Sequence, residues 1–479
     1  MILPKEQIYR YMRHIIMPEI SGAGQKKLLE CGVQVFGETA EATAPLLYYL
    51  AASGIGHIVC GFQRGEEGAG EILENLRDLN PDVLVENIPS KSIGPSLDKN
   101  AGEPFFRVIL GGPDFIADWL EENSSITATG IGSPTVVALQ MPWEGWIWVF
   151  KGRTSITMDA CKNLCKKPVK DFFSAGGILS CCLLGALAAI EVIKLCLNLG
   201  KAPEIPMGFD LLSMEFTNTY ESAFPEYDTP THPEADKKSK LAQSKVLIVG
   251  TGGLGSPAAY ALTLAGVGTL GLVDSDNVEI SNLNRQILHS TSRIGTPKAK
   301  SAEYFLKKLN PGVNTITYGT RFTEANAMDI IRDFDVVVSA VDNLPTRFLL
   351  NDACFFGKKP LVEAGVLRFN GLGMTIIPGD GPCYRCVFPE MPPAGSVPSC
   401  SEAGILGPVP GVMGFIQAAE TVKIITERGK LLKNRLLIYD ALDVEFRTAG
   451  FNKDESCPLC GRRPSITQLK EYEYNCSDQ

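Results

Sequence analysis

Four short sequence patterns occur twice along this chain of 479 residues, in the same order both times. They are a Gly-x-Gly pair, an Asn-Pro pair after an amphipathic stretch, a small-residue segment ending in Glu, and an aromatic-Asp pair followed by Glu-Phe. The copies are 53–56 and 265–268, 76–83 and 306–313, 185–191 and 414–420, and 209–216 and 439–446. A repeat of this length predicts two homologous domains, fewer than the three suggested by chain length alone.

The repeat divides the chain into two halves joined by a charged segment that contains three prolines. We predict a first domain over 1–221, a linker over 222–240, a second domain over 241–463 and a C-terminal tail over 464–479. The second copy is longer in one place only, between 274 and 300. Something local was therefore lost from the first copy or retained in the second.

Short apolar runs alternate with helical patterns in each half. In the second half, a strand over 246–249 leads through a glycine turn into a helix over 256–265, and further strands follow over 270–273 and 335–340. This alternation predicts an α/β fold: two tandem Rossmann-like, doubly wound domains with mainly parallel sheets and helices on both faces. The apolar stretch 175–190 is too short for a bilayer span of roughly 20 residues and predicts a buried core helix.

The glycine turn of the second half fits the pattern G-x-G-x-x-G. Gly250, Gly252, Gly253 and Gly255 would let backbone N–H groups approach phosphate oxygens at a helix N-terminus. Asp274 ends the next strand, where a carboxylate can accept hydrogen bonds from ribose hydroxyls. These residues alone are equally typical of an NAD-dependent dehydrogenase, and a glycine turn without a ligand is the simpler alternative.

Cations and amides follow the ribose carboxylate. Asn282, Arg285, Gln286 and Lys298 would offset the charge of a triphosphate, which a dehydrogenase does not need. The alternative for Lys298 is a solvated basic helix face.

A third strand ends at Asp342-Asn343. An acidic residue there can hold Mg²⁺ against phosphates, although a helix N-cap requires the same residue types.

These motifs resemble the adenylation domain of the HesA/MoeB/ThiF family, bacterial relatives of the ubiquitin-activating enzymes, and most closely its MoeB-type members. The resemblance rests on residues 250–255, Asp274 with Asp276, residues 281–286, Lys298 and residues 341–343, and it spans about 240–463. It implies that Arg285 and Lys298 bind the triphosphate of ATP, that Asp274 binds ribose, and that Asp342 organises Mg²⁺. The first half then resembles a degenerate copy of the same domain.

The activity implied by the resemblance is ATP-dependent adenylation of the C-terminal glycine of a ubiquitin-like sulfur-carrier protein ending in Gly-Gly. Such enzymes serve sulfur transfer in cofactor biosynthesis, including that of the molybdenum cofactor, and the sulfur donor would here be a separate protein. One alternative is ThiF-type activation for thiazole or peptide modification. An alternative from another class is an NAD-dependent oxidoreductase.

Four cysteines form two C-x-x-C pairs far apart in the sequence: Cys383, Cys386, Cys457 and Cys460. Four thiolates suit tetrahedral Zn²⁺ and leave no open position, so we predict a structural zinc site. A redox pair or disulfides are the alternatives. In the first half the only pair of similar kind is Cys161 and Cys165, whose spacing differs, and no second pair follows, so we expect no zinc there.

Cys400 stands apart in a segment rich in Pro and Gly. Relatives carry a cysteine here that forms a covalent intermediate with the activated carrier in some members. The alternative is a loop thiol without a catalytic role.

The first half lacks the features of a nucleotide site. Its turn reads Gly37-Glu-Thr-Ala-Glu, Phe62 replaces the strand-ending aspartate, and the stretch that would carry the two cations is missing. Glu38 and Glu41 would repel phosphate, so we expect no nucleotide there.

The start of the first half, 10–18, nevertheless resembles the N-terminal segment of the family, including an arginine that reaches the ATP site of the partner subunit. We therefore expect Arg13 to complete the site of the second half. The chain would then be a monomeric pseudo-dimer with one ATP and one zinc. The alternative is that Arg13 only caps a surface helix.

The net charge, the start of the chain and the cysteine content limit the classes of partner and the compartments that we expect. The formal net charge of −9 argues against a general nucleic-acid coat. No basic-then-apolar leader opens the chain, so we expect neither secretion nor a membrane anchor. Fourteen cysteines without such a leader indicate thiols or metal ligands in the cytoplasm.

Overall fold

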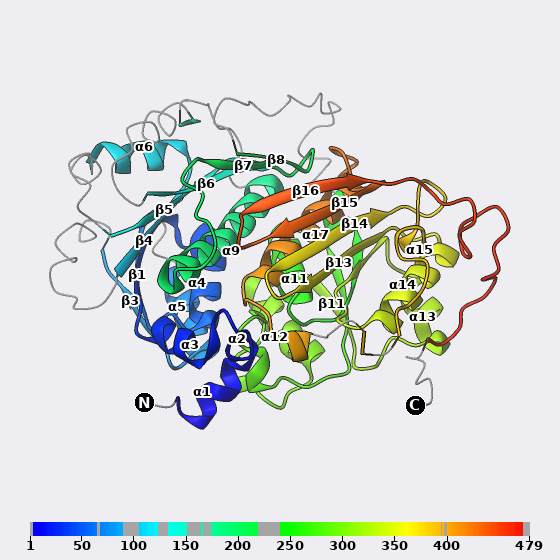
Figure 1. The fold of residues 1–479 in the computed structure, drawn as a ribbon, viewed down its shortest axis with the longest axis horizontal. Helices are drawn as coiled ribbons and strands as arrows, with labels where there is room; N and C mark the ends of the chain where they lie inside the picture. Colours follow the sequence, from blue (N-terminus) through cyan, green and yellow to red (C-terminus); the bar gives the residue numbers. More distant parts are fainter. Residues whose placement is uncertain are drawn as a thin grey trace.

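The computed structural model describes residues 3–64, 68–89, 105–122, 133–150, 164–165, 174–218, 240–393, 395–396 and 400–472. Within these residues each half forms a sheet of eight strands (Figure 1). The two strand orders are β3-β2-β1-β4-β5-β6-β7-β8 and β11-β10-β9-β12-β13-β14-β15-β16, so the topology repeats with the sequence. The predicted α/β fold is confirmed.

The first half contains the helices α1 Lys5–Arg10, α2 Met12–Ile15, α3 Ser21–Leu29, α4 Ala40–Ser53, α5 Ala69–Leu79, α6 Pro113–Glu122 and α9 Ala175–Leu197. Its strands are β1 Gly32–Thr39, β2 His57–Arg64, β3 Leu84–Asn87, β4 Phe105–Gly111, β5 Thr135–Gln140, β6 Glu144–Phe150, β7 Met207–Asp210 and β8 Glu215–Thr217.

The second half contains the helices α11 Gly255–Leu264, α12 Lys298–Leu309, α13 Glu324–Ile331, α14 Leu344–Gly357, α15 Tyr384–Val387, α16 Cys400–Ala403 and α17 Val409–Thr426, with 3₁₀ turns η4 Ile280–Asn282 and η5 Thr291–Arg293. Its strands are β9 Lys245–Val249, β10 Thr269–Val273, β11 Asn314–Tyr318, β12 Val336–Ser339, β13 Leu361–Leu367, β14 Asn370–Ile376, β15 Arg435–Asp440 and β16 Glu445–Gly450.

Five strands of each sheet are parallel and the last three are antiparallel. In the second half the parallel pairs join β11, β10, β9, β12 and β13, whereas β14, β15 and β16 alternate in direction. The change of direction follows from the length of the connection between the strands. A tight hairpin joins β13 to β14, whereas a parallel pair needs a long crossover. The expected mainly parallel sheets are therefore confirmed, and the three antiparallel strands that end each sheet were not foreseen.

Helix α9 is the apolar stretch predicted to be a core helix. Its 23 residues make it long and apolar enough to cross a membrane, so the expectation that it was too short is wrong: the helix continues past 190 to Leu197. Burial decides its role instead, because 89% of its most apolar window lies inside the protein. The prediction of a buried core helix is confirmed.

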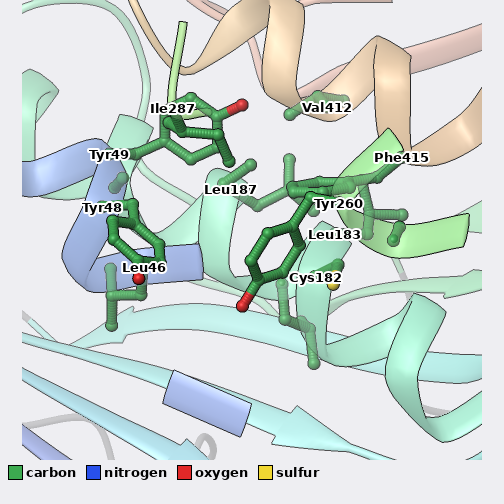
Figure 2. Packing of buried hydrophobic residues seen from close by; sticks show 14 of the residues in the cluster. Leu46, Tyr48, Tyr49, Cys182, Leu183, Leu187, Tyr260, Ile287, Val412 and Phe415 are labelled. Atoms are coloured by element: carbon green, nitrogen blue, oxygen red, sulfur yellow. The ribbon is translucent and has the colours of Figure 1, made fainter. Parts of the chain in front are cut away.

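The two halves share one hydrophobic core, in which α9 packs against its counterpart α17 (Figure 1). Aromatic rings from both halves meet there: Tyr48 lies 6.1 Å from Tyr260, and Tyr49 lies 6.2 Å from Phe415, measured between ring centroids (Figure 2). At the far end of the sheets, Phe216 stacks on Phe446 at 4.0 Å. The interface therefore resembles the interior of a single domain.

The repeated small-residue segments lie on these two helices, and the structure explains their glycines. A Cβ on Gly185 would lie 2.7 Å from the backbone N of Leu46, and a Cβ on Gly414 would lie 2.5 Å from the carbonyl O of Leu254. Each glycine thus allows its helix to cross α4 or α11 at close range.

The repeated glutamates at the ends of these segments each form a buried ion pair with a lysine one turn further along the same helix. Glu191 lies 3.0 Å from the Nζ of Lys194, and Glu420 lies 2.5 Å from the Nζ of Lys423. Lys423 also donates to the carbonyl of Leu212 in the other half at 3.4 Å. The repeat therefore places matched charged pairs where the halves join.

Candidate active site and metal centre

The glycine turn follows β9 at the carboxyl edge of the second sheet. Gly250 has φ +93°, and a Cβ there would lie 2.6 Å from the carbonyl O of Ala340. A Cβ on Gly255 would lie only 1.9 Å from the carbonyl O of Gly250, so no other residue fits. Gly252 and Gly253 have more room, since the nearest atom to either Cβ is 3.3 Å away. The first and last glycines therefore set the shape of the turn, and the middle two leave its backbone accessible.

Asp274 lies directly after β10 and is fixed by three donors. Its Oδ2 accepts from the backbone N of Thr251 at 2.8 Å and from the Thr251 hydroxyl at 3.0 Å. Its Oδ1 accepts from the backbone N of Asp276 at 3.0 Å. Thr251, which sequence reasoning missed, thus links the glycine turn to this carboxylate.

Arg285 lies against the turn. Its Cδ is 3.7 Å from the position that a Cβ on Gly253 would take, and its NH1 donates to the carbonyl of Ser281 at 2.8 Å and to the Oδ1 of Asn284 at 3.0 Å. The structure therefore brings the side chain of a cationic residue next to the backbone that could hold phosphates.

Lys298 begins α12 and pairs with Asp276 at 2.9 Å. Its side chain is only 10% exposed, so it does not belong to a solvated basic face. The pair places a second cation on the same side of β10 as Asp274.

Two of the predicted nucleotide ligands have structural partners. Asn282 accepts from the backbone N of Glu279 at 3.0 Å in a capping box, and Asn343 caps α14 by accepting from the backbone N of Thr346 at 2.9 Å. Gln286 is buried beside Gly252, and Asp342 is exposed. The N-cap that was the alternative for the Asp342-Asn343 pair therefore falls on Asn343 and leaves the carboxylate of Asp342 available.

Gly250, Asp274 and Asp342 follow three neighbouring parallel strands, in the order β10-β9-β12. The carboxyl ends of these strands share one edge, and the chain reverses its direction of winding at β9. Ligands of open α/β sheets bind at such a switch point.

The first half reaches this region with its N-terminal helices. The carbonyl of Arg13 accepts from the backbone N of Ile405 at 3.0 Å, and the Nε2 of His14 accepts from the backbone N of Gly407 at 3.0 Å. Burial and then the charge of Arg285 lower the pKa of His14 to about 4, although its bond to Gln25 opposes this. The segment around Arg13 thus lies beside the second half, close to Arg285.

The corresponding place in the first half is closed by its own side chains. The carboxylate of Glu38 accepts from the backbone N of Gly112 at 2.8 Å, at the end of β4. A Cβ on Gly37 would lie 2.0 Å from the hydroxyl of Thr43, and Phe62, paired in register with Gly37, is buried. An acid therefore stands where the second half offers a turn of glycines.

The four cysteines of the two C-x-x-C pairs come together at the edge of the second half. Their Sγ atoms all lie within 4.8 Å of one another, and the Sγ of Cys383 is 3.6 Å from that of Cys457 and 4.0 Å from that of Cys386. Such spacings suit four thiolates around one Zn²⁺. Cys161, the first-half cysteine expected not to bind zinc, lies outside the described residues.

The tail residues up to Tyr472 pack beside this centre. Arg385, between the first two cysteines, makes a two-pronged ion pair with Asp352, with both N···O distances 2.9 Å, and lies 5.1 Å from the Tyr472 ring. The Tyr472 hydroxyl donates to the same carboxylate. The four-cysteine group and the side chains beside it therefore connect α14, the segment that follows β14, and the tail.

Cys400 is the first residue of α16. Its side chain, like residues 397–399 before it, lies outside the described part of the chain. The predicted covalent role for Cys400 stays a prediction.

Comparison with known proteins adds to this geometry. The model of the ThiF family matches residues 227–459. The SAMP-activating enzyme E1 of Haloferax volcanii is 45% identical over 237 residues, which cover 50% of this chain and 87% of that protein. The sulfur carrier protein adenylyltransferase of Thermus thermophilus is 45% identical over 244 residues, covering 50% and 90%.

A third relative is longer. The adenylyltransferase and sulfurtransferase MOCS3 of Dictyostelium discoideum is 48% identical over 238 residues, covering 49% of this chain but only 56% of that protein. The chain therefore spans just over half of MOCS3 but most of the other two relatives. On the strength of these matches, the chain belongs to the ThiF family.

Proposed function

We propose that the chain is an ATP-dependent adenylyltransferase that activates the C-terminal glycine of a ubiquitin-like sulfur-carrier protein. The carboxylate of the carrier attacks the α-phosphorus of ATP, an acyl–adenylate bond forms, and pyrophosphate leaves. The attacking group is already ionised, so no protein nucleophile is required. The names of the relatives support this reaction, because two are adenylyltransferases and one of these acts on a sulfur carrier protein.

In this proposal the second half binds the nucleotide. The backbone of the glycine turn and the side chains of Arg285 and Lys298 hold the phosphates, and Asp274 accepts from the ribose. Asp342 would hold Mg²⁺, which offsets phosphate charge when it is bound. The protein's contribution is to hold two anions together and stabilise the charge that develops between them.

The four-cysteine group would hold a structural Zn²⁺. Four thiolates fill a tetrahedral site and leave no position for substrate. The metal would hold the segment that follows β14 against the segment that follows β16, next to the tail. It would take no part in adenylation.

The first half would act as a permanent partner subunit. Arg13 would reach the phosphates bound by the second half, and the closed first site would bind no nucleotide. The expected particle is a monomer with one ATP and one zinc, and two bound ATP per chain would contradict this division of labour. The sulfur donor would be a separate protein.

The observation that carries the proposal is the asymmetry between the two sheet edges. Arg285 lies against a turn of glycines in the second half, whereas Glu38 blocks the same place in the first. An NAD-dependent oxidoreductase would need the glycine turn and Asp274 but not the two cations beside them.

Pyrophosphate exchange tests the proposal. Exchange should depend on a carrier ending in Gly-Gly, and Asp342→Ala should abolish it. Asp114→Ala, which removes an acid near the corresponding strand end of the first half, is the matched control and should keep it. Exchange without a carrier, or none with any carrier, would overturn the proposal.

Two further measurements separate the alternatives. Stabilisation in a thermal-shift experiment by ATP·Mg²⁺ and not by NAD⁺ would exclude the oxidoreductase. Adenylation needs no thiol, so Cys400→Ala should keep carrier-dependent exchange. A thiol-sensitive adduct between enzyme and carrier that Cys400→Ala removes would support the ThiF-type alternative for the later step.

A further inference from the structure

The segment that joins β10 to α12, residues 274–297, is absent from the first half, where a much shorter connection leads from β2 to α5. Its last turn, η5, lies against the end of α5 of the first half. The carboxylate of Asp78 accepts from the backbone N of Ser292 at 2.9 Å and from its hydroxyl at 2.6 Å. Arg10 donates to the hydroxyl of Thr291 at 3.2 Å. The first half therefore holds the segment that carries Arg285.

Arg293, the residue after Ser292, extends this series of contacts into the second half. The Nε of Arg293 donates to the hydroxyl of Ser301 at 3.0 Å, and its NH2 donates to the carbonyl of Leu288 at 2.8 Å. Burial alone would raise the pKa of Asp78, but hydrogen bonds from Ser290 and Ser292 and the charge of Arg293 lower it. Asp78 is thus a carboxylate whose charge faces Arg293.

A buried histidine connects Ser301 to the glycine turn. The Nε2 of His289 lies 3.1 Å from the carbonyl O of Thr251, which can only accept, so Nε2 carries the proton. The Nδ1 lies 3.0 Å from the hydroxyl of Ser301 and accepts from it. Burial, together with the charges of Lys298 and Arg293, lowers the pKa of His289 to about 3, which keeps the ring neutral in this role.

The chain of contacts ends at the ribose carboxylate. Thr251 receives His289 and the hydroxyl of Ser256 on its carbonyl, and it donates both its N–H and its hydroxyl to Asp274. A continuous series of hydrogen bonds and charge contacts therefore runs from the first half to the centre of the nucleotide site in the second.

We propose that Asp78, in the half without a nucleotide site of its own, is a positioning residue for nucleotide binding by the other half. It fixes η5, so that Arg293, through Ser301 and His289, orients Thr251 and hence Asp274. This inference rests on the proposed function, because it assigns the nucleotide to the second site. It goes beyond Arg13, since Asp78 acts on the protein and not on ATP.

Asp78→Asn keeps the size of the side chain and removes its charge. We expect MgATP to bind about tenfold more weakly in calorimetry, as when a group that orients a binding side chain is lost. The KM for ATP should rise by the same factor, and the KM for the carrier should stay within about twofold. Arg293→Lys should have an equal effect, and the double variant should be no weaker than either single one.

Glu74→Gln is the matched control. Glu74 is exposed on the same helix, so this variant removes a charge of the same sign from α5. It should bind MgATP as the wild type does. Equal losses in both variants, with both KM values raised and a lower melting temperature, would mean that any loss of charge from α5 weakens the protein as a whole and would overturn the proposal. So would wild-type affinity in Asp78→Asn.

Amide hydrogen exchange without nucleotide separates this inference from the proposed function. Asp78→Asn should speed exchange in 288–293 and at 250–253, whereas Glu74→Gln should leave both as in the wild type. A wild-type chain that bound no MgATP would overturn the proposed function, and exchange at 250–253 would still decide whether Asp78 orders the turn. Unchanged exchange there would overturn the inference.

Discussion

Acidification should destabilise the protein through two buried histidines that are held neutral. His14 is fully buried, with its Nδ1 2.9 Å from the Oε1 of Gln25 and its Nε2 accepting from Gly407 of the other half. His289 is buried between Ser301 and the glycine turn. Protonation of His14 would place a proton on Nε2, so that two N–H donors would face each other and the hydrogen bond from Gly407, a contact between the halves, would be lost.

The sign and size follow from the two pKa values. Burial lowers the pKa of His14 from 6.5 to about 4 and that of His289 to about 3. Below pH 6.5 the histidines of the unfolded chain bind protons, whereas those of the folded chain stay neutral. The contribution of the two neutral histidines to stability is therefore complete above pH 6.5 and is lost as the pH falls toward the folded pKa values. By about pH 5 each histidine costs roughly 2 kcal/mol, and the pair costs about 4 kcal/mol.

Urea unfolding at about pH 7.5 and about pH 5 measures this loss in the wild type and in His14→Gln and His289→Gln. A variant's own destabilisation is present at both pH values and cancels in the difference. Each variant should therefore lose about 2 kcal/mol less on acidification than the wild type. His57→Gln is the control, because His57 is partly exposed at the surface beside Glu86.

The reasoning fails if His14→Gln and His289→Gln lose as much stability on acidification as the wild type. It also fails if His57→Gln reduces the loss as much as the other two variants do. In the first case the acid sensitivity would reside in other groups, such as the carboxylates. In the second case burial of the ring would not be its cause.

Three other predictions follow from the packing. Gly255→Ala places a Cβ 1.9 Å from the carbonyl O of Gly250, so the turn must open and MgATP affinity in calorimetry should fall by about 100-fold. Cys383→Ser should reduce the zinc content from about one per chain to near zero in elemental analysis and lower the melting temperature by roughly 5–10 °C. Phe216→Ala removes the ring stacked on Phe446 and should lower the free energy of unfolding by about 2 kcal/mol in urea titration.

Each of these variants has a control of the same kind. Gly319→Ala adds a methyl group with no atom within 4 Å, Cys165→Ser removes a thiol of the first half, and Ile205→Ala truncates a side chain that is 53% exposed. Retained ATP affinity in Gly255→Ala would show that the turn tolerates the methyl group. Retained zinc in Cys383→Ser, or a control that changes as much as its partner variant, would refute the corresponding prediction.

Local spacing was sufficient to predict an α/β fold with mainly parallel sheets and a repeat of its topology, but not the antiparallel strands that complete each sheet. The repeated Asn-Pro and Gly-x-Gly pairs mark the same turns in two sheets of identical strand order. Phe62, aligned with Asp274 by sequence, takes the equivalent place in the register opposite Gly37, although β2 continues beyond it to Arg64. These features depend on neighbours in the chain or on strand periodicity, which a sequence displays directly.

Spacing could not reveal which polar side chains are used by the fold itself. Asn282 and Asn343 look like ligands in a motif, yet both cap helical turns, because an amide near a backbone N–H forms that bond locally. His289 was not predicted at all. Its partners Thr251 and Ser301 become neighbours only when the glycine turn and α12 pack together, although its place in the segment missing from the first half was a usable signal.

The same distinction bears on the proposal that the first half binds no nucleotide and still serves the second. Loss of the site needed only local changes, such as Glu38 in the turn, and left α9 free to bury its apolar surface against α17. The second half keeps the glycine turn, but the segment that carries Arg285 is held from outside by Asp78. Among the described residues, the first half has no turn of glycines at this edge, and the second half takes part of the support of its 274–297 segment from the first. Separating the halves would expose the shared core and break the contacts of Asp78 with Ser292 together, so the proposed adenylation should require both halves in one chain.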